Sequence, residues 1–263
     1  MPFTLTQVTV ADGPALAANN IPAFWADPHW RLEWRHRTLE YHISQVALRY
    51  PRTLIRNPDS SRHQKAVGVD TGEVLGYARW SIPVDAVRST ADGKTDRSVE
   101  GGEGVGGVEQ GEGQTLVVWP EAMVPRVTPE EEAEIQRVAG TAVWDPDGAT
   151  DPLLEPARKI EEEILARKTY MRLDYLAVHP KHQRQGVATA LVRSGLEQAD
   201  KLGLDVFVRA MKPGVPVYQR LGFRLERELI QDDSEYGGPG DFGDYFLVYE
   251  QSGKGDSDEK DAP

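Results

Sequence analysis

The sequence contains no cysteine among its 263 residues. A disulfide framework, a cysteine-ligated metal and a cysteine nucleophile are therefore excluded, and any acyl transfer has to proceed without a cysteine-linked acyl-enzyme. Long apolar runs are also missing, since no stretch approaches the roughly 20 apolar residues of a membrane helix. The first residues lack the basic and apolar parts of a signal peptide. We therefore expect a globular protein without a membrane partner, in the cytoplasm or the nucleus.

Basic residues are few, because 30 Lys and Arg stand against 42 Asp and Glu, which gives a formal net charge of -12. Nucleic-acid binding needs clustered Lys and Arg, so nucleic acid is not an expected partner. The acidic balance mildly favours cationic partners instead. Part of the acidity lies in residues 252–263, for which we expect a disordered tail.

The first third of the chain predicts a strand, two helices and a hairpin. Alternation of side chains and helical spacing, with turn residues between them, define these elements. They are a strand at 3–10, a helix beginning near Asp12, a helix at 34–48 ended by Pro51, and hairpin strands at 66–70 and 73–82 around a turn at 70–72.

Residues 84–168 predict an insertion inside a single domain that covers residues 1–251. Glu100–Gly113 holds seven Gly and four Glu in fourteen residues, so we expect a flexible loop at about 88–114. Two helices are expected after it, at 129–138 with Thr128 as N-cap and at 154–168. Gly102-x-Gly104-x-x-Gly107 matches the dinucleotide-binding fingerprint, but no strand precedes it and no helix follows, so we reject that interpretation.

Regular patterns return at residue 170 and predict a βαβ unit. A strand at Tyr170–Val178 is followed by an amphipathic helix at 186–202, with Gly203 as its C-terminal cap, and by a strand at 205–210. A short helix at 215–221 and strands at 223–230 and 245–250 complete the domain.

The segment His179–Ala188 joins the predicted strand to the helix through Gln183-x-x-Gly186-x-Ala188. Unpaired backbone N–H groups and the positive end of the helix dipole meet at such a junction and suit a pyrophosphate. Gly186 and Ala188 let a phosphate approach the backbone closely. Arg184 and Arg193 are candidates for charge-assisted contacts. Any junction between a strand and a helix contains such residues, so the pattern alone does not decide between the two interpretations.

Further residues carry a resemblance to a known family. The strand ends in Leu176-Ala177-Val178-His179-Pro180, and Tyr218-Gln219-Arg220-Leu221-Gly222-Phe223 follows the next strand. In this order the segments resemble the GNAT superfamily of acyl-CoA-dependent N-acetyltransferases, most strongly over 170–223. Residues 23–28 and the following helix resemble fungal-type members.

The resemblance implies an α/β (α+β) fold with a mixed, mostly antiparallel central sheet flanked by helices and a long insertion before the cofactor-binding strand. It also implies acetyl-CoA as co-substrate, and a homodimer is an expectation because dimers are common in the family. Three strand residues would pair with the pantetheine arm, seven loop residues would hold the pyrophosphate, and Tyr218 would stand near the thioester sulfur. These residues are Leu176, Ala177 and Val178, then Gln183, Arg184, Gln185, Gly186, Val187, Ala188 and Thr189.

The chemistry requires a neutral amine, a donor for the carbonyl oxygen and a proton for the leaving thiolate. The phenol of Tyr218, with a pKa near ~10, can protonate a thiolate whose conjugate acid has a pKa near ~8.5. The Val178 N–H could polarise the carbonyl. Asp174 is the candidate base, because it lies four residues before Val178 on one strand and therefore on the same face. Core packing for Tyr218 and a structural carboxylate for Asp174 are the alternatives.

We expect acetyl transfer to a primary amine of a small molecule by direct attack in a ternary complex. Acetylation of a protein N-terminus or lysine, and a non-catalytic acyl-CoA-binding module, are the alternatives. Candidate wall residues of the acceptor pocket, each with ordinary packing as the alternative, are Phe24, Trp25, Trp34 and Tyr236. His179 and His182 form an H-x-x-H pair, but no metal is expected.

Overall fold

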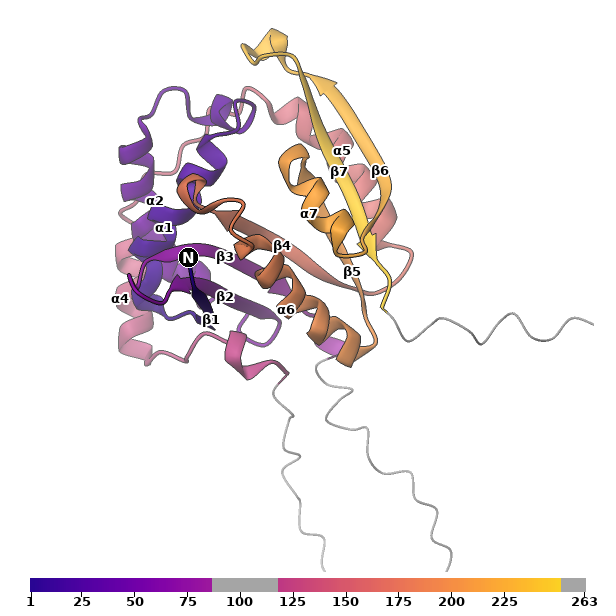
Figure 1. Ribbon diagram of the computed structural model, residues 1–263. Coiled ribbons are helices and arrows are strands. Elements are labelled where there is room, and N and C mark those ends of the chain that lie inside the picture. Colours follow the sequence, from indigo (N-terminus) through magenta and orange to yellow (C-terminus); the bar gives the residue numbers. More distant parts are fainter. Residues whose placement is uncertain (87–117, 252–263) are drawn as a thin grey trace, which may run out of the picture.

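The computed structural model describes residues 1–86 and 118–251, so the predicted Gly/Glu-rich loop at about 88–114 and the tail at 252–263 lie outside the described residues. Seven strands form one sheet in the order β1-β2-β3-β4-β5-β7-β6 (Figure 1). Only β4 and β5 pair in parallel among the described strands. This confirms the mixed, mostly antiparallel sheet. The strands are β1 (Phe3–Gln7), β2 (Ser61–Gly68), β3 (Val74–Ser81), β4 (Tyr170–Val178), β5 (Asp205–Met211), β6 (Arg224–Asp232) and β7 (Asp241–Tyr249).

Helices cover both faces of the sheet. α1 and α2 pack around Tyr77, and α5 packs on Phe207, whereas α6 and α7 pack on the opposite face around Trp80. No helix within the described ranges is long and apolar enough to cross a membrane. The α-helices are α1 (Gly13–Trp25), α2 (Leu39–Leu54), α4 (Pro129–Ala139), α5 (Asp151–Leu165), α6 (Val187–Leu202) and α7 (Val215–Arg220), and the 3-10 helices are η1 (Val10–Asp12), η2 (Trp30–Trp34), η3 (Pro120–Ala122), η4 (Pro180–His182), η5 (Lys212–Gly214) and η6 (Ser234–Tyr236).

Most predicted helices are confirmed, and local capping explains their ends. Thr128 and Glu131 form a capping box at the start of α4, and Gly203 ends α6 with a φ of 64°. The prediction for α2 was wrong at both ends, because the helix begins after the Thr38 cap and continues through Pro51 to Leu54. Proline removes one backbone donor. Here its ring packs on α1, where a Cβ on Gly13 would lie 2.9 Å from Pro51 Cδ.

Strand β2 begins at Ser61, five residues earlier than the sequence predicts. Its first residues are polar, yet Arg62 and His63 are buried. Arg62 donates to the backbone oxygen of Val118, and a ring nitrogen of His63 lies 2.7 Å from the Tyr77 hydroxyl. These partners lie elsewhere in the chain and let polar side chains be buried here, which is why alternation of hydrophobic residues did not reveal the strand.

The sheet forks between β4 and β5. Their parallel pairing covers Tyr170–Arg172 against Asp205–Phe207, after which β4 continues beside β3 while β5 follows β7. Figure 1 shows the two strands diverging as a V. The two arms of the sheet therefore separate beyond Arg172 and Phe207, and the predicted site residues lie around this fork.

Candidate active site

The last residues of β4 present free backbone groups to the fork. His179 N donates to Leu75 O at 3.3 Å, so the N–H groups that point toward β3 belong to odd-numbered residues here. Because hydrogen-bonding groups alternate sides along a strand, the N–H groups of Leu176 and Val178 point away from β3 and into the fork. Asn19 of α1 holds this strand end in place by donating to Ala177 O at 3.4 Å.

The loop before α6 ends at the same place. Gly186 has a φ of 84° and Arg184 a φ of 59°, so the chain turns twice through the left-handed region before the helix starts. No side chain caps α6, and its first internal bond runs from Ala190 N to Gly186 O. The N–H groups of residues 187–189 therefore have no partner inside the helix and lie at the positive end of its dipole.

The structure brings the predicted cofactor residues of the strand and the loop together. Gln183 Nε2 donates to Val178 O at 3.4 Å and so ties the loop to the strand end. Residues 183–186 are exposed, whereas Val187 is buried in the core beneath them. Arg193 is exposed but lies about 9 Å further along α6, given a rise of about 1.5 Å per residue. A ligand phosphate at the helix end would meet backbone N–H groups before it meets Arg193.

Tyr218 lies in α7 on the face that α6 covers. Its side chain is 4% exposed, and its ring packs edge-on against Phe223 with 5.5 Å between the ring centroids. A Cβ on Gly214 would lie 3.1 Å from the Tyr218 ring. Within the described part of the chain its hydroxyl has no hydrogen-bond partner. Burial raises the pKa of the Tyr218 phenol above its usual value. The phenol therefore stays protonated at neutral pH and can act as a donor.

Asp174 lies on the other face of the sheet from the Val178 side chain, so the predicted shared face was wrong. Arg79 pairs with Tyr175 and Trp80 with Leu173, which leaves Asp174 as the extra residue of a β-bulge. A bulge breaks the alternation of side chains. Val178 consequently packs in the core under α6, while Asp174 accepts a hydrogen bond from the Ser81 hydroxyl on the opposite face.

Two arginines stand beside the Asp174 carboxylate. Arg172 Nε lies 3.5 Å from one of its oxygens and Arg79 Nε lies 4.0 Å from the other. The side chain of Asp174 is 16% exposed, so part of it is accessible to solvent or a ligand. Asp174 and Tyr218 thus lie on opposite faces of the sheet, and the fork is the opening through which one ligand could reach both.

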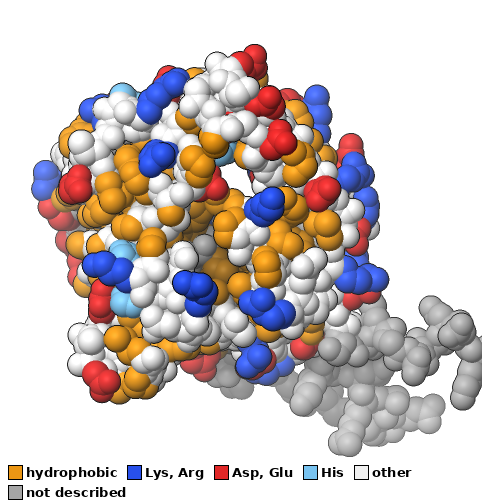
Figure 2. All heavy atoms as spheres, turned by 45° about the horizontal axis from the view of Figure 1, so that its top comes forward, with side chains coloured by type: hydrophobic (Ala, Val, Ile, Leu, Met, Phe, Trp, Pro, Cys, Tyr) orange, Lys and Arg blue, Asp and Glu red, His pale blue; other side chains and the backbone are white. Residues whose placement is uncertain are grey.

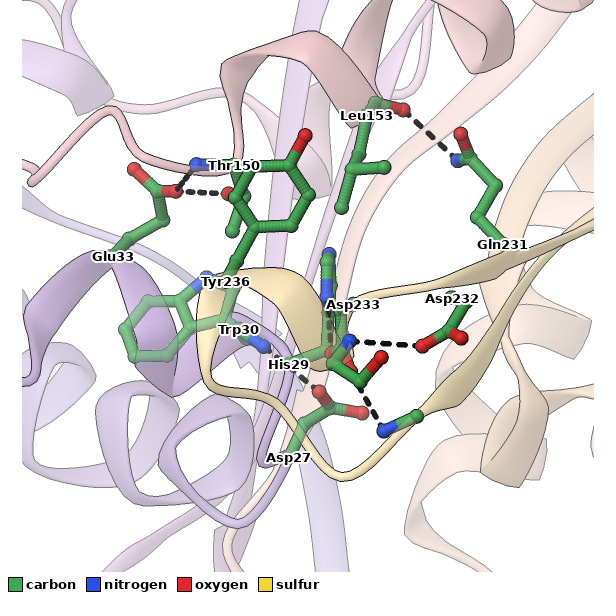
Figure 3. Close-up of polar contacts among 12 residues, drawn as sticks. Asp27, His29, Trp30, Glu33, Thr150, Leu153, Gln231, Asp232, Asp233 and Tyr236 are labelled. Atoms are coloured by element: carbon green, nitrogen blue, oxygen red, sulfur yellow. Dashed lines mark hydrogen bonds and ion pairs between the residues drawn. The ribbon is translucent and has the colours of Figure 1, made fainter.

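A bridge joins the two arms at the wide end of the fork, and no sequence pattern indicated it. His29 Nδ1 lies 2.9 Å from Asp233 Oδ2 (Figure 3). The His29 ring also stacks on Phe242, with 3.5 Å between the ring centroids. Arg35 Nη1 donates to Tyr236 O at 3.0 Å. Residues 27–37 after α1 are therefore fastened to the β6–β7 hairpin.

The predicted insertion contributes a third segment to this bridge. Glu33 accepts hydrogen bonds from the backbone N–H of Gly148 at 3.1 Å and from the Thr150 hydroxyl. Gln231 Nε2 of β6 donates to Leu153 O of α5 at 2.9 Å (Figure 3). Figure 2 shows a hollow in the middle of this side of the molecule, with hydrophobic side chains in it and Lys and Arg side chains near its rim. Residues 27–37, the segment before α5 and the β6–β7 hairpin are thus linked to one another at this end of the fork.

The predicted wall residues have different surroundings. Phe24 packs on Tyr175 of β4 at 4.8 Å and so lies beside the bulge. Trp34 is 3% exposed and packs on His42 at 4.0 Å, which makes it a core residue instead of a wall residue. Trp25 packs against Trp30 and His42, while Tyr236 accepts the bond from Arg35 through its backbone oxygen.

The H-x-x-H histidines have structural partners. His179 Nδ1 accepts a hydrogen bond from Lys181 N at 3.2 Å, and His182 is buried 3.3 Å from a Glu73 oxygen. Among residues 1–86 and 118–251, no group of three acidic or histidine side chains could hold a metal ion.

A family comparison covers part of this arrangement. Residues 163–234 match the model of the acetyltransferase (GNAT) domain, a segment that includes β4, the loop before α6, α6, β5, α7 and β6. The chain is similar to a GNAT acetyltransferase domain over this segment. It is an acyltransferase enzyme, and the fork, the uncapped helix and Tyr218 all belong to the matched segment of the acetyltransferase.

The chain is similar to solved structures at low sequence identity, and the first of these shares its fold. A protein from Corynebacterium glutamicum described as histone acetyltransferase HPA2 and related acetyltransferase is 14% identical, with a TM-score of 0.52, over 96% of this chain and 98% of that one. The Drosophila melanogaster polyamine N-acetyltransferase is 13% identical with a TM-score of 0.46, over 95% and 100%. The PaiA N-acetyltransferase from Thermoplasma acidophilum, in complex with coenzyme A, is 10% identical with a TM-score of 0.45, over 95% and 99%. The resemblance to fungal-type members stays a prediction.

Proposed function

We propose that the acetyltransferase moves an acetyl group from acetyl-CoA to a primary amine of a small molecule. One observation carries the proposal. The uncapped N-terminus of α6 and the free backbone edge of β4 open at the same point, joined by the contact of Gln183 with Val178. A thioester with a long polar arm and a pyrophosphate needs both kinds of partner at that spacing.

In this proposal, each part of acetyl-CoA has its own partner. The pyrophosphate would accept hydrogen bonds from the N–H groups of residues 187–189, with Arg184 close by on an exposed turn. The pantetheine amides would pair with Leu176 and Val178 as a neighbouring strand does. The acetyl group would then lie in the fork beyond Leu176, toward the base of the fork, since the Val178 N–H would already be paired with the arm.

The reaction is a direct attack within a ternary complex. The amine nitrogen bonds to the thioester carbon, the carbon–sulfur bond breaks, and the thiolate takes the proton of the Tyr218 hydroxyl. Burial raises the pKa of that phenol, so the hydroxyl carries its proton at neutral pH but gives it up less readily than a phenol in water. Asp174, on the face from which the amine would enter, is the proposed acceptor of the amine proton, directly or through one water. A cysteine-linked intermediate is excluded because the chain has no cysteine.

The bridge supports a small acceptor over a protein one. A peptide would need a groove open at both ends, but residues 27–37, 145–153 and the β6–β7 hairpin are fastened together across the fork by the His29–Asp233, Glu33–Thr150 and Gln231–Leu153 contacts. A peptide acceptor would have to break several of these contacts, two of which involve charged groups.

Release of free thiol from acetyl-CoA, measured with a panel of small amines and with lysine-containing peptides, tests the proposal. We expect turnover with small amines and initial-velocity lines that intersect, as a ternary complex requires. Parallel lines would contradict direct attack. Turnover with peptides alone would favour protein acetylation, and binding of acetyl-CoA without any thiol release would favour a non-catalytic module.

A further inference from the structure

A polar pocket opens on the face covered by α2 and α5, at the base of the fork. Its volume is about 460 Å³. Leu173 and Asp174 of β4 line it together with Phe207 and Arg209 of β5, and these are the residues at and just beyond the end of the β4–β5 pairing. The pocket therefore contains the proposed base and adjoins the point where the acetyl group would lie.

Arginine dominates the charge of this pocket. Four arginines and two acidic residues line it, namely Arg56, Arg79, Arg172, Arg209, Glu161 and Asp174. Two of the arginines are paired, since Arg172 Nη2 lies 2.6 Å from Glu161 and Arg209 Nε lies 2.7 Å from Asp244.

The other two arginines have donors to spare. Arg79 is 31% exposed, and its contact with Asp174 is long, at 4.0 Å. Arg56 is exposed, and its guanidinium has no ion-pair partner within the described ranges. A guanidinium presents donors in a fork that matches a carboxylate or a phosphate, and these bonds strengthen where solvent is partly excluded.

We propose that this pocket receives the acceptor and that the acceptor carries an anionic group, a carboxylate or a phosphate, in addition to its amine. The inference rests on the proposed function. Arg56 and Arg79 bind the anion, while Asp174, 4.0 Å from Arg79 Nε, faces the amine. Both groups of such an acceptor fit within one pocket of this size.

This inference reverses the expectation of a cationic acceptor that the net charge of -12 suggested. Charges further away than the Debye length, about 8 Å at physiological salt, are largely screened. The sign of the charge within the pocket therefore decides which acceptor is favoured. A polyamine would place its second ammonium beside Arg56 and Arg79, where like charges repel.

Matched amines that differ in the anionic group test the inference. Lysine is compared with cadaverine and arginine with agmatine for the carboxylate, and glucosamine 6-phosphate with glucosamine for the phosphate, by the kcat/KM of thiol release. We expect the anionic member of at least one pair to be favoured by about tenfold or more, the value of one hydrogen bond to a charged group. Which pair responds distinguishes a carboxylate from a phosphate.

Variants assign the preference to the pocket. Arg56→Gln and Arg79→Gln should each lower the preference for the anionic member by about tenfold. Arg126→Gln is the matched control, because it makes the same charge change on an exposed residue outside the pocket lining. Arg126 follows Met123 by three positions, and the backbone oxygen of Met123 accepts a hydrogen bond from Gln7 of the edge strand β1. This variant should leave the preference unaltered.

The outcomes separate the inference from the function on which it rests. Acetylation of cadaverine, agmatine and glucosamine in preference to all three anionic partners would overturn the anion site and leave the proposed function standing. A preference that survives in both Arg56→Gln and Arg79→Gln would also overturn the site. Thiol release with none of the six amines, from protein that binds acetyl-CoA, would count against the proposed function itself and take the inference with it.

Discussion

Replacing Gly186 by alanine should weaken the binding of acetyl-CoA without creating a clash in the protein. Gly186 has a φ of 84°, and a Cβ built on it would meet nothing within 4 Å. The cost of the substitution is therefore conformational, about 1–2 kcal/mol for a residue with a side chain in the left-handed region. The chain can avoid this cost by turning Gly186 toward the right-handed region, which would move the N–H groups of residues 187–189.

The magnitude follows from the bonds at stake. A hydrogen bond to a charged group contributes roughly 1.5–3 kcal/mol. If one of the three N–H groups loses the pyrophosphate, the Kd for acetyl-CoA should rise about tenfold to a hundredfold. Isothermal titration calorimetry measures this change, and chemical denaturation measures the accompanying loss in the free energy of unfolding.

Gly203→Ala is the matched control at the other end of the same helix. Gly203 has a φ of 64° and likewise has nothing within 4 Å of its built Cβ. The two glycines lie about 24 Å apart, since α6 has 16 residues at a rise of about 1.5 Å each. We expect similar losses of stability in both variants but weaker binding only in Gly186→Ala. Equal Kd values in the two variants would refute the assignment of the pyrophosphate to this helix end.

Three further predictions concern catalysis and stability. Tyr218→Phe should lower kcat about 10²-fold or more, because the thiolate loses its proton donor, with little change in the Kd for acetyl-CoA; an unchanged kcat would make Tyr218 a packing residue. Asp174→Asn should flatten the acidic limb of the pH–rate profile, whereas a retained limb would exclude Asp174 as the base. Burial lowers the pKa of His42 from its ordinary value of 6.5 to about 4, so the unfolded chain binds the proton first and the free energy of unfolding should fall as the pH drops from about 6.5 to 4. In His42→Gln this slope, measured by urea denaturation at several pH values, should be shallower than in the wild type, and an identical slope would contradict the shift.

The core of the fold could be predicted because its local patterns agree with its tertiary role. β4 begins and ends where alternation and the turn residues indicated, and α6 has the predicted Gly203 cap. The loop from Gln183 to Gly186 needs left-handed turns and small residues, and these requirements appear directly in the sequence. The candidate cofactor residues on the strand and in the loop could therefore be predicted from the sequence.

The face on which Asp174 lies could not be predicted from one strand. Side-chain alternation assumes a regular ladder, but the bulge depends on the register against β3, where Arg79 pairs with Tyr175 and Trp80 with Leu173. The partner strand lies about 90 residues earlier in the chain. Nothing in residues 170–178 alone specifies which residue is left over.

The bridge and the pocket were also out of reach of sequence reasoning. His29 and Asp233 are separated by 204 positions, and neither belongs to a periodic pattern or a motif. The arginines of the pocket come from the residues just after α2, from β3, from β4 and from β5. The net charge of the sequence does not show that these separate arginines gather in one pocket. Long-range packing, which no local pattern records, decides the acceptor side of the site.

Calorimetric titration of the full chain with acetyl-CoA, with CoA and NAD as comparison ligands, tests whether the fork binds the cofactor. We expect acetyl-CoA and CoA to bind, because both carry the pyrophosphate and pantetheine that the α6 N-terminus and the β4 edge would accommodate. NAD should not bind, since it has a pyrophosphate but no pantetheine arm to pair with Leu176 and Val178. No heat with acetyl-CoA, or binding of NAD as tight as that of acetyl-CoA, would contradict the assignment of the fork as an acetyl-CoA site.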